Sequence, residues 1–201
     1  MDGIELMATA MHAAQGRLDV SAANLANVSS DGFHRRVARA ALTARGLVTS
    51  SRIDAAQGPL QHTGRTFDLA IVGAGGFLVR DRGGHVSESR SGSFERNALG
   101  ELADDRARVL MGAHGPIRAS SDAAIDSRGI VREAARETGR IALRPGTTLQ
   151  SGFIEASNVD AVGEMVDVLA AQRAFETAQK TLSALDEERE KDANDVVRVK
   201  S

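Results

Sequence analysis

The sequence predicts an α+β protein, in which long coiled-coil-type helices at both ends of the chain pack together and a small antiparallel all-β domain is inserted between them. Two observations support this. Apolar residues recur in steps of three and four at both ends of the chain, and the stretch between has a period of two with many glycines. These patterns divide the chain into 1–32, an N-terminal helix and turn; 33–58, an extended connector; 59–150, a β-rich domain; and 151–201, a C-terminal helix.

The N-terminal helix carries one apolar stripe. Its members alternate steps of three and four, which is the a/d spacing of a coiled-coil seam: Ile4, Met7, Met11, Ala14, Leu18, Ser21, Leu25 and Val28. Alanines beside the stripe let other helices approach closely. Asp31-Gly32 is a turn signal, and Gly32 can take a positive φ where the helix stops.

The last third of the chain predicts a second and longer helix. Residues 155–199 lack proline and contain only one glycine, Gly163. Ser157 or Asn158 is expected to cap the helix, with Asp160 completing a capping box. One stripe is predicted, comprising Val162, Met165, Leu169, Gln172, Phe175, Ala178, Leu182 and Leu185. At 1.5 Å per residue the helix would measure about 60 Å, so it needs a partner along its length, as in an assembly subunit.

Residues 60–150 predict a meander of short antiparallel strands. Phe67, Leu69 and Ile71 alternate with other residues, and a glycine-rich run at 73–76 is expected to form a hairpin turn before the next strand. The run lacks the full spacing of a dinucleotide loop and does not lead into a helix, so a nucleotide site is not predicted.

The composition excludes several classes of function. The 201 residues include no Trp, Tyr or Cys and only six Phe, so the core must be mostly aliphatic and disulfides are excluded. The net charge of −2 provides no basic field for nucleic acid. No segment has the ~18–20 consecutive apolar residues of a membrane span. The start of the chain carries acids where a cleavable secretory signal would be positive.

The polar residues suggest no active site. Five histidines are scattered without the spacing of metal ligands: His12, His34, His62, His85 and His114. The acids at 104–105 and 186–192 are expected to be solvated, and Arg35 and Arg36 to contact an acidic neighbour. No nucleophile, base and oxyanion donor can be assembled, so no enzyme activity, cofactor or metal is predicted.

Four motifs, one of them in two parts, point to a family. SAANLANVSSDGFHRR, at residues 21–36, and two segments near the other end, EASNVD at 155–160 and QRAFE at 172–176, resemble the terminal signatures of the bacterial flagellar axial proteins, the rod and hook subunits. FDLAIVGAGGFLV and SRSGSFERNALGEL resemble the start of that family's β-domain. His34 stands where lysine or arginine is more usual, Gly76 where an aromatic residue is common, and Glu88 where a tyrosine-like residue is expected.

The resemblance implies a structural subunit of the flagellar basal-body rod, of the compact distal type, that self-assembles into a helical tube transmitting torque. Its implied partners are copies of itself, other rod and hook proteins, and the flagellar type III export apparatus, without nucleic acid or a membrane span. The implied location is the basal body, outside the cytoplasm, after export without a cleaved signal peptide.

The expected assembly interface comprises the two helical stripes and the matching motif residues: Ile4, Met7, Met11, Leu18, Asn24, Leu25, Asn27, Val28, Gly32, Phe33, Asn158, Val162, Met165, Leu169, Gln172, Arg173, Phe175 and Leu182. Three alternatives remain open. They are a hook subunit of minimal size, a coiled-coil adaptor whose helices pair within one dimer, and a small hydrolase or binding enzyme built on the β-domain. A concentration-independent dimer would favour the adaptor. A pocket that contains an acid or a histidine with a shifted pKa would favour the enzyme.

Overall fold

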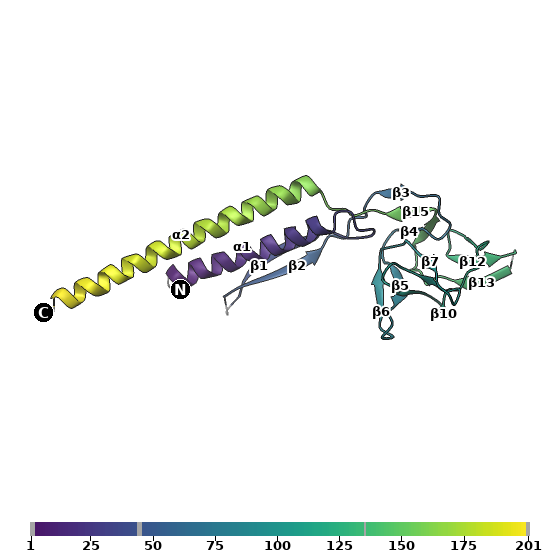
Figure 1. The fold of residues 1–201 in the computed structure, drawn as a ribbon, viewed down its shortest axis with the longest axis horizontal. Helices are drawn as coiled ribbons and strands as arrows, with labels where there is room; N and C mark the ends of the chain where they lie inside the picture. Colours follow the sequence, from purple (N-terminus) through teal and green to yellow (C-terminus); the bar gives the residue numbers. More distant parts are fainter. Residues whose placement is uncertain (1–2, 44–45, 135, 200–201) are drawn as a thin grey trace. The chain divides into compact units, whose positions relative to one another are not determined.

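The structure, a computed structural model, describes residues 3–43, 46–134 and 136–199. It contains two helices and several small antiparallel sheets (Figure 1), so the predicted α+β class is confirmed. The chain divides into two compact units. We call the first the helical unit; it holds α1 (Gly3–Ala26), β1 (Arg36–Thr43), β2 (Gly46–Ile53) and α2 (Ala161–Val199). The second, the β-rich unit, comprises residues 27–34 and 55–159.

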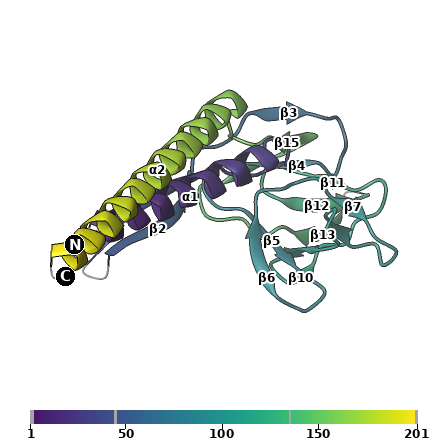
Figure 2. The same cartoon turned by 60° about the vertical axis from the view of Figure 1, so that its left-hand side comes forward.

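The two helices of the helical unit pack side by side and run in opposite directions (Figures 1 and 2). Small side chains are buried at this contact, among them Ala14 and Ser21 from α1 and Ala171 and Ala178 from α2. A helix face of small residues permits close approach of the backbones. The helices therefore pair within one chain, over the length that α1 provides.

A two-stranded hairpin covers another side of α1. β1 and β2 pair antiparallel from Arg36↔Ile53 to Thr43↔Gly46, and both strands contact α1. A Cβ added to Gly16 of α1 would lie 2.4 Å from Cγ2 of Thr49, so the absence of a side chain at Gly16 permits this contact. Residues 33–58 were expected to form only an extended connector, and the pairing of this segment was not predicted.

The β-rich unit consists of short strands. Their bounds are β3 (Leu60–His62), β4 (Leu69–Val72), β5 (Phe77–Arg80), β6 (Val86–Ser89), β7 (Glu95–Arg96), β8 (Leu102–Ala103), β9 (Val109–Gly112), β10 (Gly115–Pro116), β11 (Ala124–Ile125), β12 (Ile130–Glu133), β13 (Arg136–Arg140), β14 (Thr148–Ser151) and β15 (Phe153–Glu155). Among the described residues, the largest sheet has the order β6-β5-β9-β8-β7, with β10 on β9; β11-β12-β13 form a second, and β14-β4 and β15-β3 are pairs.

The core of the β-rich unit is mostly aliphatic, as the composition predicts. Its fully buried members include Leu69, Ile71, Leu102 and Leu110, from three different strands. Phe77 also belongs to this core, where its ring meets the ring of Phe94 edge to face at 5.2 Å. This core holds the strands that position the polar cluster described below.

The glycine-rich run at 73–76 is not a hairpin turn, so that prediction was wrong. β4 before the run pairs with β14, whereas β5 after it pairs with β6 and β9. The run therefore carries the chain from one sheet to another. Gly73 and Gly75 adopt φ angles of 112° and 101°, which side chains disfavour.

The start of the second helix also differs from the prediction. Residues 153–155 belong to strand β15, because Glu155 pairs with Leu60, and the helix begins only at Ala161. The N-cap is Asp160, whose carboxylate accepts the N–H of Val162 at 3.1 Å. Neither Ser157 nor Asn158 caps the helix, since both precede it by more than two residues.

Candidate functional site

Two sequence motifs far apart in the chain meet in the β-rich unit. The N–H of Gly32 donates to the carbonyl of Glu155 at 2.6 Å, and the N–H of Asn158 donates to the carbonyl of Phe33 at 3.3 Å. The side chain of Asn158 also donates to the carbonyl of Ala56 at 2.7 Å. The turn after α1 is thus bound to the segment that follows β15.

Gly32 is required at this junction. Its φ of 65° confirms the positive value predicted from the turn signal. An added Cβ would lie 2.3 Å from the nitrogen of Ser91 and 2.2 Å from the carbonyl carbon of Arg90. Both the φ angle and the backbone contact exclude a side chain, so the turn can pack directly on the backbone of Arg90 and Ser91.

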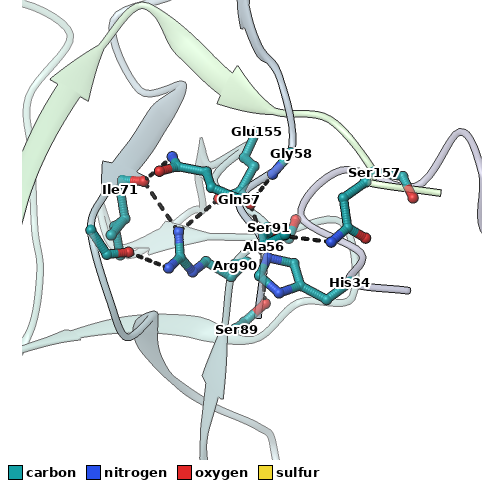
Figure 3. Close-up of polar contacts among 12 residues, drawn as sticks. His34, Ala56, Gln57, Gly58, Ile71, Ser89, Arg90, Ser91, Glu155 and Ser157 are labelled. Atoms are coloured by element: carbon teal, nitrogen blue, oxygen red, sulfur yellow. Dashed lines mark hydrogen bonds and ion pairs between the residues drawn. The ribbon is translucent and has the colours of Figure 1, made fainter. Parts of the chain in front are cut away.

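A buried carboxylate holds the junction together (Figure 3). Glu155 is fully buried, and it accepts hydrogen bonds from the N–H of Gly58 at 3.0 Å and from Nη1 of Arg90 at 2.8 Å. Nε2 of His34 lies 2.9 Å from its Oε1 and donates to it, since an ionised carboxylate can only accept. Arg90 also donates to the carbonyl of Ile71 at 3.2 Å.

The Glu155 cluster therefore has a structural role. Three donors from separate segments occupy its carboxylate, and the guanidinium of Arg90 balances its charge. A buried charge that is paired and hydrogen-bonded in this way fixes the segments around it, whereas removal of one partner is strongly destabilising. Carboxylate oxygens held by fixed donors are not placed to act on a substrate.

Asn24 performs a similar task in the helical unit. This fully buried residue of α1 donates from Nδ2 to the carbonyl of Arg36 at 2.7 Å and accepts the N–H of Arg36 at 2.8 Å. An amide side chain carries both a donor and an acceptor, so it can pair with a peptide group as a neighbouring strand would. The first residue of β1 is thereby attached to α1.

A second buried acid joins Arg35, the residue before β1, to α2. Nε of Arg35 donates to Oε1 of Glu164 at 2.5 Å, and its Nη2 lies 3.3 Å from Oδ2 of Asp167. The hydrogen bond that Arg35 donates to Glu164 raises the pKa of Arg35 above its ordinary value. Oε2 of Glu164 is buried and has no hydrogen-bond partner among the described residues. The predicted acidic neighbour is thus found for Arg35, as two carboxylates of the same chain, but not for Arg36, which forms no ion pair with the described residues.

A polar cleft of about 400 Å³ lies beside the turn of residues 29–33, in the β-rich unit. Serine hydroxyls and two arginines, Arg106 and Arg108, contribute to its lining. Asp31 lies there as well; burial and, second, the charge of Asp68 raise its pKa. Among the residues that the structure describes, no group of three His, Asp or Glu side chains could hold a metal ion.

The first turns of α2 expose an apolar surface, which we call the α2 stripe. Its members are spaced by three, one and three residues and are more than half exposed: Val162 71%, Met165 55%, Val166 60% and Leu169 54%. The opposite face of the helix carries the buried Glu164, Ala171 and Ala178. The stripe therefore points away from the contact with α1.

The predicted interface residues fall into three groups. Those half-buried in the helical unit are Ile4, Met7, Met11, Leu18, Leu25, Phe175 and Leu182, together with the fully buried Asn24. Those half-buried in the β-rich unit are Asn27, Val28, Gly32, Phe33 and Asn158. Those exposed on α2 are Val162, Met165, Leu169, Gln172 and Arg173. The first two groups are thus covered within their own units, whereas the third group is left uncovered.

The single stripe predicted on the second helix is split between two faces. Leu169 is exposed, whereas Ala178 is buried and Phe175 and Leu182 are half-buried. From Leu169 to Ala178 the predicted stripe advances by three successive steps of three residues. Nine residues at 3.6 per turn make 2.5 turns, so the two positions lie on opposite sides of the helix.

Sequence reasoning missed the roles of Glu155, Arg90 and Glu164. Glu164, Ala171 and Ala178 follow one another at intervals of seven residues, and this spacing places Glu164 on the buried face of α2. A buried acid in that register needs a cationic partner, which Arg35 supplies. Arg90 gave no local signal, because its role depends on long-range pairing.

Comparisons with known proteins place the chain among proteins of one type. The family model described as flagella basal body rod protein matches residues 4–34, and that of the flagellar basal body rod FlgEFG protein C-terminal region matches residues 150–196. The chain is 30% identical to the flagellar basal-body rod protein FlgF of Caulobacter vibrioides, over 82% of this chain and 85% of the relative. It is 28% identical to FlgG of Agrobacterium fabrum, over 93% of this chain and 96% of the relative. It is 27% identical to FlgF of Escherichia coli, over 89% of this chain and 93% of the relative.

Proposed function

The chain belongs to the family of flagellar basal-body rod proteins, and from this premise we propose that its copies join through the α2 stripe into a helical tube. It is a structural subunit of the flagellar basal body and not an enzyme. Its other partners are proteins of the same basal body, and in the described residues no helix is long and apolar enough to span a membrane.

The exposure of the α2 stripe carries this proposal. Four large apolar side chains lie together on one helical face, in a unit whose buried face already uses small residues and Glu164. A contiguous exposed apolar patch of this kind marks a surface for protein association. Burying these side chains against a neighbour would stabilise the contact by ~25 cal/mol for each Å² removed from water.

Whether the assembly is open depends on which surface of the next copy the stripe contacts. If the stripe packs on a different surface of the next copy, the contact is heterologous and generates a helical array unless it closes into a ring. The tube would then transmit torque along its axis through many repeated contacts. The paired helices would form its inner layer.

The family further supports export by the flagellar type III apparatus, without a cleaved signal peptide, as part of this proposal. The compact β-rich unit supports a rod subunit of the distal type over a hook subunit. The coverage of the relatives, between 85% and 96% in those named above, agrees with that size.

Sedimentation and electron microscopy of the concentrated full chain, alone and mixed with the other rod subunits, test the proposal. We expect a concentration-dependent increase in size and elongated tubular assemblies. A dimer of constant mass at every concentration, with and without the other subunits, would overturn the proposal and favour the coiled-coil adaptor.

A further inference from the structure

The helical unit contains a cationic cleft. The cleft has a volume of about 320 Å³ and is lined by residues of α1, β1 and α2 and by Arg35, which precedes β1. Its charged lining residues are Arg17, Arg35, Arg36 and Asp167. Its other lining residues include the small side chains of Ala170 and Ala171, which leave room for an inserted group. We call it the arginine cleft.

Two of the three cations have no anionic partner among the described residues. Arg35 is paired with Glu164 and Asp167, whereas Arg17 and Arg36 are exposed and lie in no ion pair that the described part of the chain provides. A guanidinium binds carboxylates through a planar fork of N–H groups. The arginine cleft is therefore suited to an acidic segment.

The chain itself carries such a segment. An added Cβ on Gly3 would lie 3.4 Å from Cδ1 of Leu185, so the start of α1 lies beside Leu185. Helix α2 continues beyond that point (Figure 1). Residues 186–195, which we call the acidic end, contain six acidic and two basic residues. The side chains of its first part, Asp186 to Lys191, are exposed.

The acidic end cannot reach the arginine cleft of its own chain. Ala171, which lines the cleft, and Glu188 belong to the same helix. They are 17 residues apart, which corresponds to roughly 25 Å at 1.5 Å per residue. Only another chain can bring the two charged surfaces together.

We propose that the acidic end of one copy binds in the arginine cleft of the next copy. This inference rests on the proposed function, because it assumes that copies of the chain assemble. The two surfaces are different, so the contact is head-to-tail and repeats without closing into a dimer. It would shift successive copies by roughly 25 Å along the helix axis, the spacing of the two surfaces on α2. Complementary charges at such a contact set register and association rate.

Charge reversal and charge exchange test this contact in cells that make only the variant full-length chain. We expect Arg17→Glu with Arg36→Glu, and separately Glu187→Lys with Glu188→Lys, to reduce the chain recovered in isolated basal bodies by roughly tenfold. The chain carrying all four substitutions should recover most of this loss. The matched control, Arg82→Glu with Arg96→Glu, reverses two exposed arginines of the β-rich unit and should have little effect.

Normal recovery of either reversed pair, or failure of the four-residue exchange to restore recovery, would overturn the proposal. The Leu169→Asp variant separates this result from the proposed function. If Leu169→Asp assembles normally while the reversed pairs do not, the α2 stripe is refuted and the charged contact stands. If the reversed pairs assemble normally while Leu169→Asp does not, only the charged contact is refuted.

Cross-linking provides a second measurement that does not depend on charge. The sequence has no cysteine, so Arg36→Cys and Glu187→Cys can be introduced together without background. These positions are too far apart for a bridge within one chain, because a disulfide needs Cα atoms within about 7 Å. A short thiol reagent should give a ladder of dimers, trimers and larger products. Dimers alone, or the same products with Arg82→Cys and Glu187→Cys, would contradict the head-to-tail contact.

Discussion

The side chain of Asn24 pairs with the backbone of Arg36 through two hydrogen bonds, of 2.7 and 2.8 Å. This pairing attaches the hairpin to α1 at the point where β1 begins. It gives a physical reason for an asparagine at this position of the N-terminal motif, since an amide can both donate to and accept from one peptide group.

Replacement of Asn24 by Ala should destabilise the helical unit by about 1–3 kcal/mol, because it leaves the peptide groups of Arg36 without their partner. Urea unfolding followed by the helical circular dichroism signal measures this loss. Gln15→Ala is the control; Gln15 is an exposed residue of the same helix, and its side chain donates to Asp19. Equal unfolding midpoints for Asn24→Ala and the wild-type chain would contradict the assigned role.

Glu155→Gln should destabilise the β-rich unit by about 3–5 kcal/mol, because the amide loses the charge that pairs with Arg90 and presents a donor to other donors. The amide hydrogen of Gly32 should exchange faster with solvent, since the turn that it anchors is released. Denaturant unfolding and hydrogen exchange check both expectations. Glu95→Gln, which changes a largely exposed acid, should leave both unchanged; unaltered Gly32 exchange in Glu155→Gln would refute the cluster's role.

Asp31→Asn should stabilise the chain at neutral pH. Burial, followed by the charge of Asp68, raises the pKa of Asp31 above its ordinary value of 3.8. The folded chain therefore binds the proton of the Asp31 carboxyl more tightly than the unfolded chain does. The stability that this proton contributes is fully present below the ordinary pKa and is lost as the pH rises through the raised pKa. Asparagine removes that loss.

Thermal unfolding of Asp31→Asn and the wild-type chain at several pH values checks the sign. The variant should unfold at a higher temperature at pH 7, and the difference should shrink toward zero as the pH falls to about 3. Asp122→Asn, at an exposed position, controls for the loss of one negative charge. A difference that grows as the pH falls would contradict the raised pKa.

Gly16→Ala should destabilise the helical unit, although alanine is favoured over glycine in a helix by about 1 kcal/mol. The new methyl group would lie 2.4 Å from Cγ2 of Thr49. In the Thr49→Ala background the same substitution should be much less destabilising, because Cγ2 and Oγ1 are gone and only Cβ, 3.2 Å from the new methyl group, remains. Urea unfolding of the four chains of this cycle measures the coupling; an increase in stability on both backgrounds would exclude the steric contact.

The local patterns of the sequence predicted the helices and the aliphatic core, because each depends on neighbours along the chain. The positive φ of Gly32 was predictable for the same reason: a turn signal follows the first helix. The sequence did not predict how β4 and β5 enter different sheets, because strand pairing is decided by contacts between distant residues. The roles of Glu155 and Arg90 are set by the same long-range contacts.

The stripe on the C-terminal helix shows a different limit. A stripe in steps of three and four stays on one face only when the two steps alternate, whereas three successive steps of three from Leu169 to Ala178 cross the helix to its other side. The intrachain contact uses Ala171, Ala178 and the acid Glu164, which hydropathy alone does not select. Which half of the predicted stripe is exposed depends on how α2 packs against α1, and the sequence alone does not show this packing.

The recovery of Leu169→Asp in isolated basal bodies tests the central claim most directly. A carboxylate at this position would be buried without a partner if the α2 stripe joins copies, which is costly, whereas it is solvated if the stripe stays exposed. Leu99→Asp is the matched control, because Leu99 is 71% exposed in the β-rich unit. In cells that make only the variant chain, we predict soluble, folded Leu169→Asp protein that is absent from basal bodies, with loss of motility, and normal recovery of Leu99→Asp. Normal recovery of Leu169→Asp in motile cells would contradict the claim that copies of this chain join through the α2 stripe.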